Sequence, residues 1–402
     1  MGIGNIANTG MQAAMSNMEV ISNNIANANT LGFKKSYINF EDIYPSTNGA
    51  AANQIGLGVN VASINQDFAP GSLQITGRNT DMSINGNGFF VMRDAISGTT
   101  SYTRAGRFAM DGNGYLYASG ATNRRLQGFT ALNGVIPAGG TADDIQINNS
   151  SIPAKATSSA MIKINLDSNS VAPTATFDPN DKTSYNFQTT VPIFDSLGNK
   201  HAVTSYYVKT APNTWDVRVY IDGTANTTGT LNFATDGTLS SSPGLTGITF
   251  SPTTGATAPQ VFDISMAGTT QTGIPSKVTA TDQDGYEAGA YSDFTIDSDG
   301  MVKIKYTNNQ TQLAGQVALA EFQSPEGLIQ TNNMSWVESQ QSGSANINQS
   351  NSVGNITSGQ YESSNVELTT EMVNLLGAQH AFQANAQVEQ TYNEVMQVVI
   401  KL

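Results

Sequence analysis

The chain contains no cysteine. Disulfides, thiolate metal sites and cysteine nucleophiles are therefore excluded together. It has only two histidines, His201 in a β-like segment and His380 in a helical one. Zinc sites and nucleophile–base pairs generally need more ligands or a partnered serine than this. Both histidines are therefore expected to have structural or surface roles, with no catalytic, cofactor-binding or metal-ligating residue in the chain.

Long hydrophobic runs are also missing, since no apolar stretch approaches the about 20 residues that a membrane-spanning helix requires. The first basic residue is Lys34, and no apolar segment precedes a small-residue cleavage site. A cleavable signal peptide has both features. We therefore expect no membrane insertion, and either a cytosolic protein or one exported by a route that reads an uncleaved N-terminus.

Charge is scarce. Charged residues make up 12% of the 402 residues, against about 25% in an ordinary soluble protein. The net charge is −13, which argues against a nucleic-acid partner because such proteins carry a basic footprint. The pairs Lys34–Lys35 and Arg124–Arg125 are isolated, and we expect them to be solvated loop charges without a partner.

Three Asp/Gly runs could suggest calcium binding, and each fails the test. In the run 297–300 glycine stands at the fourth position, whereas an EF-hand loop needs it at the sixth. The runs 282–285 and 111–114 fail in the same way. All three have the composition of tight turns between strands. We expect hairpins here and no enzyme.

Apolar residues recur at alternating spacings of four and three near both ends of the chain, which predicts a narrow helical stripe. The first stripe comprises Ala7, Met11, Ala14, Met18, Ile21, Ile25 and Ala28. The second has two registers, Leu368, Met372, Leu375 and Phe382, then Val388, Tyr392, Val395, Val399 and Leu402. A shift of register lets a helix contact more than one neighbour. We expect a coiled-coil pair that joins copies of the chain.

The middle of the chain has the two-residue period of β-strands. Trp215, Val217, Val219 and Ile221 alternate with polar residues, and a turn at Pro212–Asn213 connects them to a strand over 202–208. The segments 108–116 and 294–302 share the same strand, Asp/Gly turn, strand pattern. The run 46–52 is rich in turn-forming residues and is expected to be exposed.

These patterns predict an α+β, mainly β protein with two stacked β domains, the outer one inserted into the inner one. The predicted parts are a terminal helical domain (1–29 and 364–402), a linker (30–71), an inner β domain (72–145 and 286–363) and an outer β domain (146–285).

Several blocks resemble a known family. The run Ser22-Asn-Asn-Ile-Ala-Asn-Ala-Asn-Thr-Leu-Gly-Phe-Lys34 is similar to the N-terminal signature of bacterial flagellar axial proteins of the rod and hook. Blocks at 84–91, 102–108, 365–368 and 371–386 resemble further shared segments, and 191–215 resembles the outer β domain of the hook-type members. The signature residues are Asn23, Asn24, Ala26, Asn27, Gly32, Phe33 and Lys34.

The resemblance implies a structural subunit of the flagellar hook that self-assembles into a flexible tube. This tube would act as a universal joint, transmitting motor torque from rod to filament and enclosing the export channel. Implied partners are other copies, the distal rod, the hook cap, the hook-length control protein, the hook–filament junction protein and the type III export apparatus. Its implied place is extracellular, in the flagellum. The alternatives are the distal rod protein and, from another class, an extracellular β-rich adhesin; an enzyme ranks third.

Overall fold

The computed structural model describes residues 3–44, 56–132, 134–137, 139–240, 244–349 and 353–401. The predicted turn-rich run 46–52 and the predicted seam residue Leu402 lie outside these ranges. The chain divides into two compact units. The first consists of Met1–Asn149, Asp293–Ile304 and Thr311–Leu402, and the second of Ser150–Ser292 and Lys305–Gln310. The finer four-part division stays a prediction.

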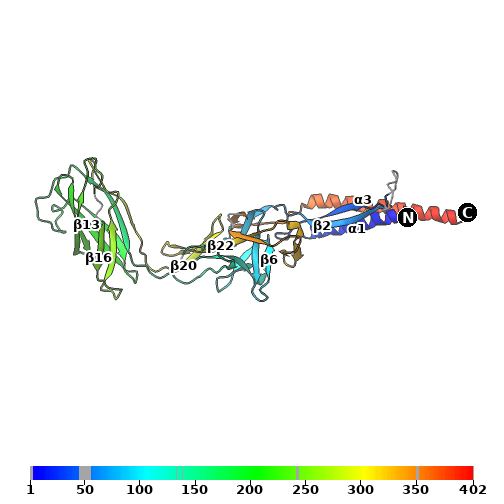
Figure 1. The fold of residues 1–402 in the computed structure, drawn as a ribbon, viewed down its shortest axis with the longest axis horizontal. Coiled ribbons are helices and arrows are strands. Elements are labelled where there is room, and N and C mark those ends of the chain that lie inside the picture. Colours follow the sequence, from blue (N-terminus) through cyan, green and yellow to red (C-terminus); the bar gives the residue numbers. More distant parts are fainter. Residues whose placement is uncertain are drawn as a thin grey trace. The chain divides into compact units, whose positions relative to one another are not determined.

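Two helices of the first unit, α1 (Ile3–Ala26) and α3 (Leu368–Lys401), lie side by side although they come from opposite ends of the chain (Figure 1). The α1 sequence is rich in asparagine and serine, which have poor helix propensity. Packing of its apolar face therefore has to stabilise it.

A twelve-stranded sheet forms the centre of the first unit, with the order β20-β21-β22-β9-β5-β6-β24-β23 along its main path. An aromatic cluster packs on it, in which the Phe89 ring lies edge-on to Phe68, Phe322 and Trp336 at 5.5–5.8 Å. The strands of this sheet are β5 (Phe89–Asp94), β6 (Thr100–Thr103), β7 (Phe108–Met110), β8 (Leu116–Ala118), β9 (Ala121–Thr130), β10 (Asp143–Asp144), β20 (Tyr291–Ile296), β21 (Met301–Tyr306), β22 (Thr311–Glu321), β23 (Ile329–Thr331), β24 (Ser335–Val337) and β25 (Asn346–Gln349).

Three two-stranded sheets complete this unit: β1 (Ser36–Asp42) with β2 (Val59–Gln66), β3 (Leu73–Ile75) with β27 (Gln360–Glu362), and β4 (Met82–Gly86) with β26 (Gly354–Ser358). A short 3-10 turn, η1 (Pro325–Gly327), follows β22. The last two sheets pair the N-terminal third of the chain with the segment that leads into α3. The two helices therefore attach to the same region.

The second unit consists of two sheets that share one hydrophobic core, with Trp215 and Tyr207 fully buried in it. The five-stranded sheet comprises β16 (Leu245–Phe250), β17 (Gln260–Ser265), β11 (Ser159–Asp167), β18 (Thr270–Thr272) and β19 (Lys277–Gln283). The four-stranded sheet comprises β12 (Phe187–Phe194), β13 (Lys200–Ala211), β14 (Thr214–Ile221) and β15 (Thr224–Asn232).

The predicted hairpin turns at 111–114, 297–300 and Pro212–Asn213 are confirmed. The one predicted at 282–285 was wrong: this run overlaps the end of β19, which pairs with the distant strand β11, and the chain after it forms isolated bridges to 152–155. Strands β13 and β14 pair antiparallel, and Asn213 between them has the positive φ of 62° that a tight turn needs. In the turns at Asp111 and Asp297, a glycine N–H three residues on donates to the aspartate carbonyl, at 3.0 and 2.9 Å. The predicted class, mainly β with terminal helices packed together, is also confirmed.

Candidate assembly surface and buried charge cluster

The predicted stripe of α1 faces inward. Ala7, Ala14 and Ile21 are buried, and the other members of the stripe, Met11, Met18, Ile25 and Ala28, are half-buried. Glycines let α3 come close: a Cβ on Gly10 would lie 2.8 Å from the Asn385 side chain, and one on Gly4 would lie 3.0 Å from Tyr392. The α1 stripe is thus used within one subunit.

The inward face of α3 differs from the predicted stripe. Apart from Ala386, its least exposed positions again follow spacings of four and three, namely Glu371, Leu375, Ala378, Phe382, Asn385, Glu389 and Tyr392. Three of the seven are polar or charged, so a search for apolar residues missed them. Of the predicted α3 residues, Leu375, Phe382 and Tyr392 belong to this face.

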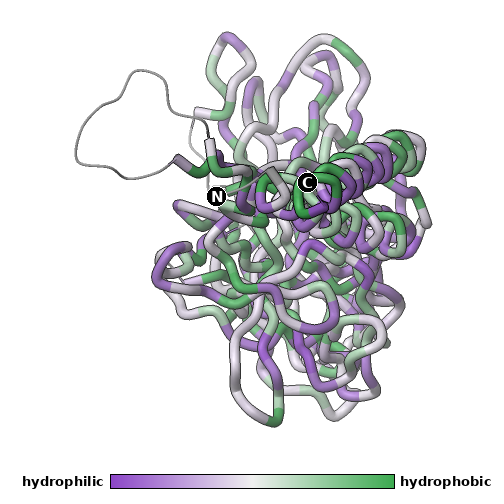
Figure 2. The backbone as a smooth tube through the Cα atoms, turned by 90° about the vertical axis from the view of Figure 1, so that its right-hand side faces the viewer, coloured by the Kyte–Doolittle hydropathy of each residue, from purple (hydrophilic) through white to green (hydrophobic). Residues whose placement is uncertain are grey.

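The remaining described residues of the predicted α3 stripe point away from α1. Leu368, Met372, Val388, Val395 and Val399 are 46–59% exposed. Among the described residues, ten large apolar side chains of this helix are more than a third exposed, the other five being Val373, Leu376, Met396, Val398 and Ile400. Apolar residues also mark its end, labelled C, in Figure 2. So much exposed apolar surface on one helix indicates a surface that binds something.

Asn24, one of the signature residues, fixes the end of α1. Its side chain accepts a hydrogen bond from Ser36 N–H at 2.9 Å and donates one to Ser36 C=O at 2.8 Å. The same amide lies 3.4 Å from the buried carboxylate of Glu371. Asn24 therefore ties the end of α1 to β1 and to the start of α3.

The other signature residues shape the chain after α1. Asn27 donates to Asn23 C=O at 3.0 Å, and both Asn23 and Ala26 are exposed. Gly32 has a φ of +65°, and a Cβ there would lie 2.6 Å from the Ala105 nitrogen. This position requires glycine for both reasons.

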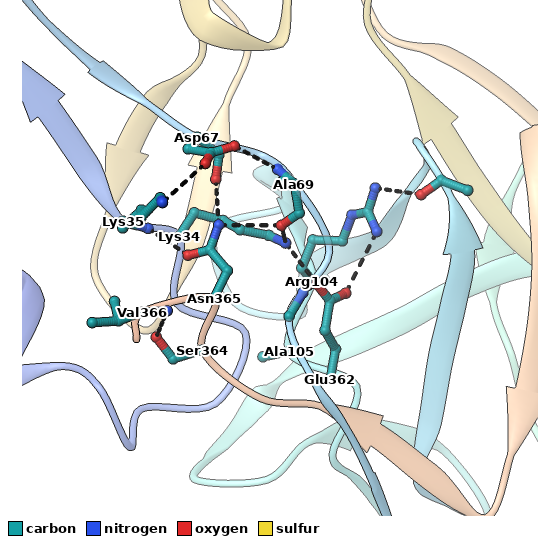
Figure 3. Close-up of polar contacts among 12 residues, drawn as sticks. Lys34, Lys35, Asp67, Ala69, Arg104, Ala105, Glu362, Ser364, Asn365 and Val366 are labelled. Atoms are coloured by element: carbon teal, nitrogen blue, oxygen red, sulfur yellow. Dashed lines mark hydrogen bonds and ion pairs between the residues drawn. The ribbon is translucent and has the colours of Figure 1, made fainter. Parts of the chain in front are cut away.

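The Phe33 side chain is only 2% exposed, and its burial anchors the segment after Gly32. Lys34 follows and is completely buried. Its Nζ donates to Glu362 Oε1 at 2.6 Å and to Ala69 C=O at 2.7 Å (Figure 3). The expectation that Lys34 is solvated was wrong, because its partner lies 328 residues away in the chain.

Glu362 stands at the centre of a buried charge cluster, defined here as Lys34, Arg104 and Glu362 (Figure 3). Its second oxygen lies 3.5 Å from Arg104 Nη1, and Gly71 N–H donates to Oε1 at 2.8 Å. Burial lowers the pKa of Lys34, and the charge and hydrogen bond of Glu362 oppose that shift.

The cluster holds together the two segments that lead into the helices. Lys34 follows α1, and Glu362 precedes α3. Arg104 anchors both to the β region, since its Nη2 donates to Gly86 C=O at 2.7 Å. Neither Arg104 nor Glu362 stood out in the sequence; the resemblance of 102–108 and of 365 onward to shared blocks was the only signal near them.

The second basic pair was also wrongly expected to be solvated. Arg124 is 8% exposed and donates to the hydroxyls of Ser101 and Ser335. Arg125 pairs with Asp144 at 2.9 Å and lies over the Tyr115 ring at 3.8 Å. Both arginines sit in β9, where neighbouring strands supply the partners.

Within the described ranges, no cluster of three or more histidine, cysteine or acidic residues could hold a metal ion. No helix in this part of the chain is long and apolar enough to cross a membrane. The arrangement offers an exposed apolar surface on α3 and a buried attachment of both helices to the β region.

Four family models match the chain. Their descriptions and ranges are flagella basal body rod protein (5–34), flagellar hook protein FlgE/F/G D1 domain (83–167), flagellar basal body protein FlaE D2 domain (165–286) and flagellar basal body rod FlgEFG protein C-terminal (357–402). The matched ranges include both the N-terminal signature and α3. A solved structure, the Helicobacter pylori flagellar hook protein FlgE2, matches with a TM-score of 0.54 at 14% identity, over 70% of this chain and 98% of that one, which supports the fold.

Curated relatives match over nearly the full length. The flagellar hook protein FlgE of Escherichia coli is 37% identical over 405 residues, and that of Salmonella typhimurium is 38% identical over 407 residues. The FlgE of Borreliella burgdorferi is 32% identical over 435 residues, and in all three cases 98% of each chain is covered. This chain therefore belongs to the flagellar hook protein FlgE family.

Proposed function

We propose that this protein is the structural subunit of the bacterial flagellar hook. Copies would assemble into a flexible tube that transmits motor torque from rod to filament and encloses an export channel. The exposed apolar face of α3, in a chain similar to hook proteins from end to end, is the observation that carries the proposal. A rod protein or an adhesin is not favoured, because the full-length relatives are hook proteins.

The proposed division of labour follows the burial pattern. The α1 stripe and the inward face of α3 hold the helix pair together within a subunit. The outward residues, among them Leu368, Met372, Val388, Val395 and Val399, bind neighbouring copies. Burying such side chains contributes about 1.5–3 kcal/mol each, so several of them are enough to hold subunits together.

The buried charge cluster would carry load between the helix pair and the β region. Lys34 and Glu362 sit on the two segments that join α1 and α3 to the rest of the first unit. Pulling either segment away would expose a buried charge without its partner, which is costly. A torque applied through the helices therefore meets a stiff connection here.

The proposed partners are the distal rod, the hook cap, the hook-length control protein and the hook–filament junction protein, besides other copies. The type III export apparatus would export the chain, without cleavage of a signal peptide, to its place in the extracellular flagellum. The role is structural and involves no catalysis.

The test compares two substitutions that add the same charge to the same helix. Val395→Asp places a carboxylate in the exposed apolar face, whereas Gln397→Asp places one at an exposed polar position. We expect electron microscopy of the concentrated protein to show tubes for Gln397→Asp and none for Val395→Asp. Thermal unfolding should be nearly unchanged for both, since exposed substitutions cost within about 0.5 kcal/mol. Equal tube formation by both variants would contradict the assignment.

A further inference from the structure

A histidine lies between two carboxylates in the second unit. His201, at the start of β13, is 8% exposed. Its Nδ1 lies 2.7 Å from Asp222 Oδ2, and its Nε2 lies 3.3 Å from Asp195 Oδ2. A neutral imidazole carries one N–H, and only the imidazolium carries two. Because carboxylates only accept, both contacts are hydrogen bonds only when the ring is protonated.

Asp195 is ionised in this arrangement. It is fully buried, and its Oδ1 accepts hydrogen bonds from the N–H groups of Leu197 and Asn199, both at 2.9 Å. Its Oδ2 accepts from Asn199 Nδ2 at 2.9 Å and from Thr254 Oγ1 at 2.8 Å. Burial raises the pKa of Asp195, but these donors outweigh it and hold the pKa well below its usual value.

The group connects the two sheets of the second unit. Asp195 lies in the turn between β12 and β13, and Asp222 follows β14, all in the four-stranded sheet. Thr254 belongs to the loop 251–259, which joins β16 to β17 in the five-stranded sheet. The same loop donates from Thr257 N–H to Ser196 Oγ at 2.8 Å. Ring contact between His201 and Phe250, at 5.0 Å between centroids, completes the junction.

Among the described residues, the loop 251–259 and the β15 residues beside the ring add no further charge to it. The loop 251–259 contains no charged residue. Thr224 and Asn226, which line the adjoining cavity of about 360 Å³ from β15, are neutral. Lys200, next to His201 in sequence, is 60% exposed and pairs with Glu287 at 4.0 Å. The protonation of His201 therefore depends on Asp195 and Asp222, and the cavity gives water access to the ring.

We propose that protonated His201 strengthens the connection between the two sheets of the second unit, and that this connection weakens as the pH rises. As an imidazolium, His201 holds Asp195 in place, and the loop 251–259 is bonded to the same β12–β13 turn through Thr254 and Thr257. When the ring gives up one proton to water, the shorter contact to Asp222 keeps the other proton on Nδ1. The Nε2 lone pair then faces the Asp195 carboxylate, two acceptors oppose each other, and the β12–β13 turn loosens together with the loop bonded to it.

The direction of the pKa shift agrees with this geometry. Burial lowers the pKa of His201, but the hydrogen bonds and charges of Asp222 and Asp195 outweigh burial and raise the pKa above its usual value. The release therefore occurs on the alkaline side of ordinary histidine titration. The inference does not depend on the proposed assembly, since every residue involved belongs to one compact unit.

The test is an NMR titration of the full-length chain in the His380→Gln background, which leaves a single histidine. We expect the His201 ring to titrate above about 6.5, the ordinary histidine value. Amide hydrogen exchange in the loop 251–259 should rise with the same midpoint, by about tenfold or more, as fits a lost hydrogen bond between charged groups.

Two variants distinguish this pH-dependent role of His201 from a purely structural one. Asp222→Asn, at a half-exposed position, should lower the His201 midpoint and shift loop release to lower pH by the same amount. Asp216→Asn, which removes a carboxylate bonded to Thr230 on the neighbouring strand, should leave both unchanged. Either of two results would overturn the proposal: a His201 midpoint at or below about 6.5 in the wild type, or amide hydrogen exchange in the loop 251–259 that does not change with the protonation of His201.

Discussion

Two groups of charged side chains among the described residues have different chemistry, the buried charge cluster of the first unit and the histidine–carboxylate group of the second. In the first unit, Glu362 binds Lys34 and Arg104, side-chain types that ordinarily titrate far above neutral pH. In the second unit, Asp195 and Asp222 bind His201, whose type titrates nearest to neutral pH. The first cluster joins segments from opposite ends of the chain, whereas the second joins turns and a loop close in sequence.

The difference indicates which connections are permanent and which respond to the surroundings. A connection that carries load between the helix pair and the β region gains from charges that stay paired across the usual pH range. The connection between the two sheets of the second unit can depend on a single proton. Losing that proton loosens the connection, and the unit keeps the rest of its fold. Three measurements test whether the two groups differ in this way.

The largest effect is expected from Lys34→Met. Removing one member of a buried ion pair costs about 3–5 kcal/mol, because the remaining charge stays buried. Glu362 would keep the hydrogen bond from Gly71 N–H, but its one remaining partner in the cluster would be Arg104, at 3.5 Å. Urea unfolding of the variant should report this loss of stability.

Lys35→Met is the matched control for Lys34→Met. Lys35 is the next residue, with a half-exposed side chain 3.5 Å from Asp67. Its loss should cost less than about 1 kcal/mol. If the two variants were equally stable, the buried charge cluster would not be the stiff connection described above.

A smaller, pH-dependent effect is expected in the second unit. The raised pKa of His201 means that its contribution is complete below the unfolded value of 6.5 and disappears as the pH rises through the folded value. The lowered pKa of Asp195 means the opposite: its contribution is complete above 3.8 and disappears on acidification. The free energy of unfolding of the second unit should therefore be highest between pH 3.8 and pH 6.5.

Thermal unfolding across pH, in wild type and His201→Gln, measures this effect. We expect the variant to lose about 1.5–3 kcal/mol at the optimum, as for a hydrogen bond to a charged group. The alkaline decline should be absent from the variant and present in His380→Gln. An alkaline decline of equal size in His201→Gln would assign it to another group.

The smallest effect is expected from an exposed pair. Arg93 and Asp143 lie 3.6 Å apart and are 50% and 67% exposed. Arg93→Gln should change the unfolding free energy by less than about 1 kcal/mol. High salt should remove the difference in unfolding free energy between Arg93→Gln and wild type, whereas most of the difference between Lys34→Met and wild type should remain. A large loss of unfolding free energy in Arg93→Gln would mean that burial does not determine how much each ion pair contributes to stability.

Much of the fold could be predicted from local pattern. The period of two identified β14, and the turn residues at Pro212–Asn213 identified its hairpin with β13. The heptad spacing identified the inward residues of α1. These features depend on neighbours a few positions away, which is the range over which periodicity carries information.

The candidate site was less predictable because its decisive contacts are long-range. Lys34 looks like a loop charge until Glu362 is placed beside it, and no local pattern links positions so far apart. The inward face of α3 uses Glu371, Asn385 and Glu389, which an apolar template cannot find. Asn24 and Gly10 accommodate that polar face, and their roles appear only once the helices are packed.

The length of α3 has one more consequence. Gly4, near the start of α1, packs beside Tyr392, and α3 continues for about 13 Å past that point at 1.5 Å per residue. If copies of the proposed tube join head to tail, each projecting segment meets the opposite end of the next copy and all copies point the same way. The resulting stack is polar, and its two tips differ chemically. The rate constants for adding a subunit then differ between the two tips.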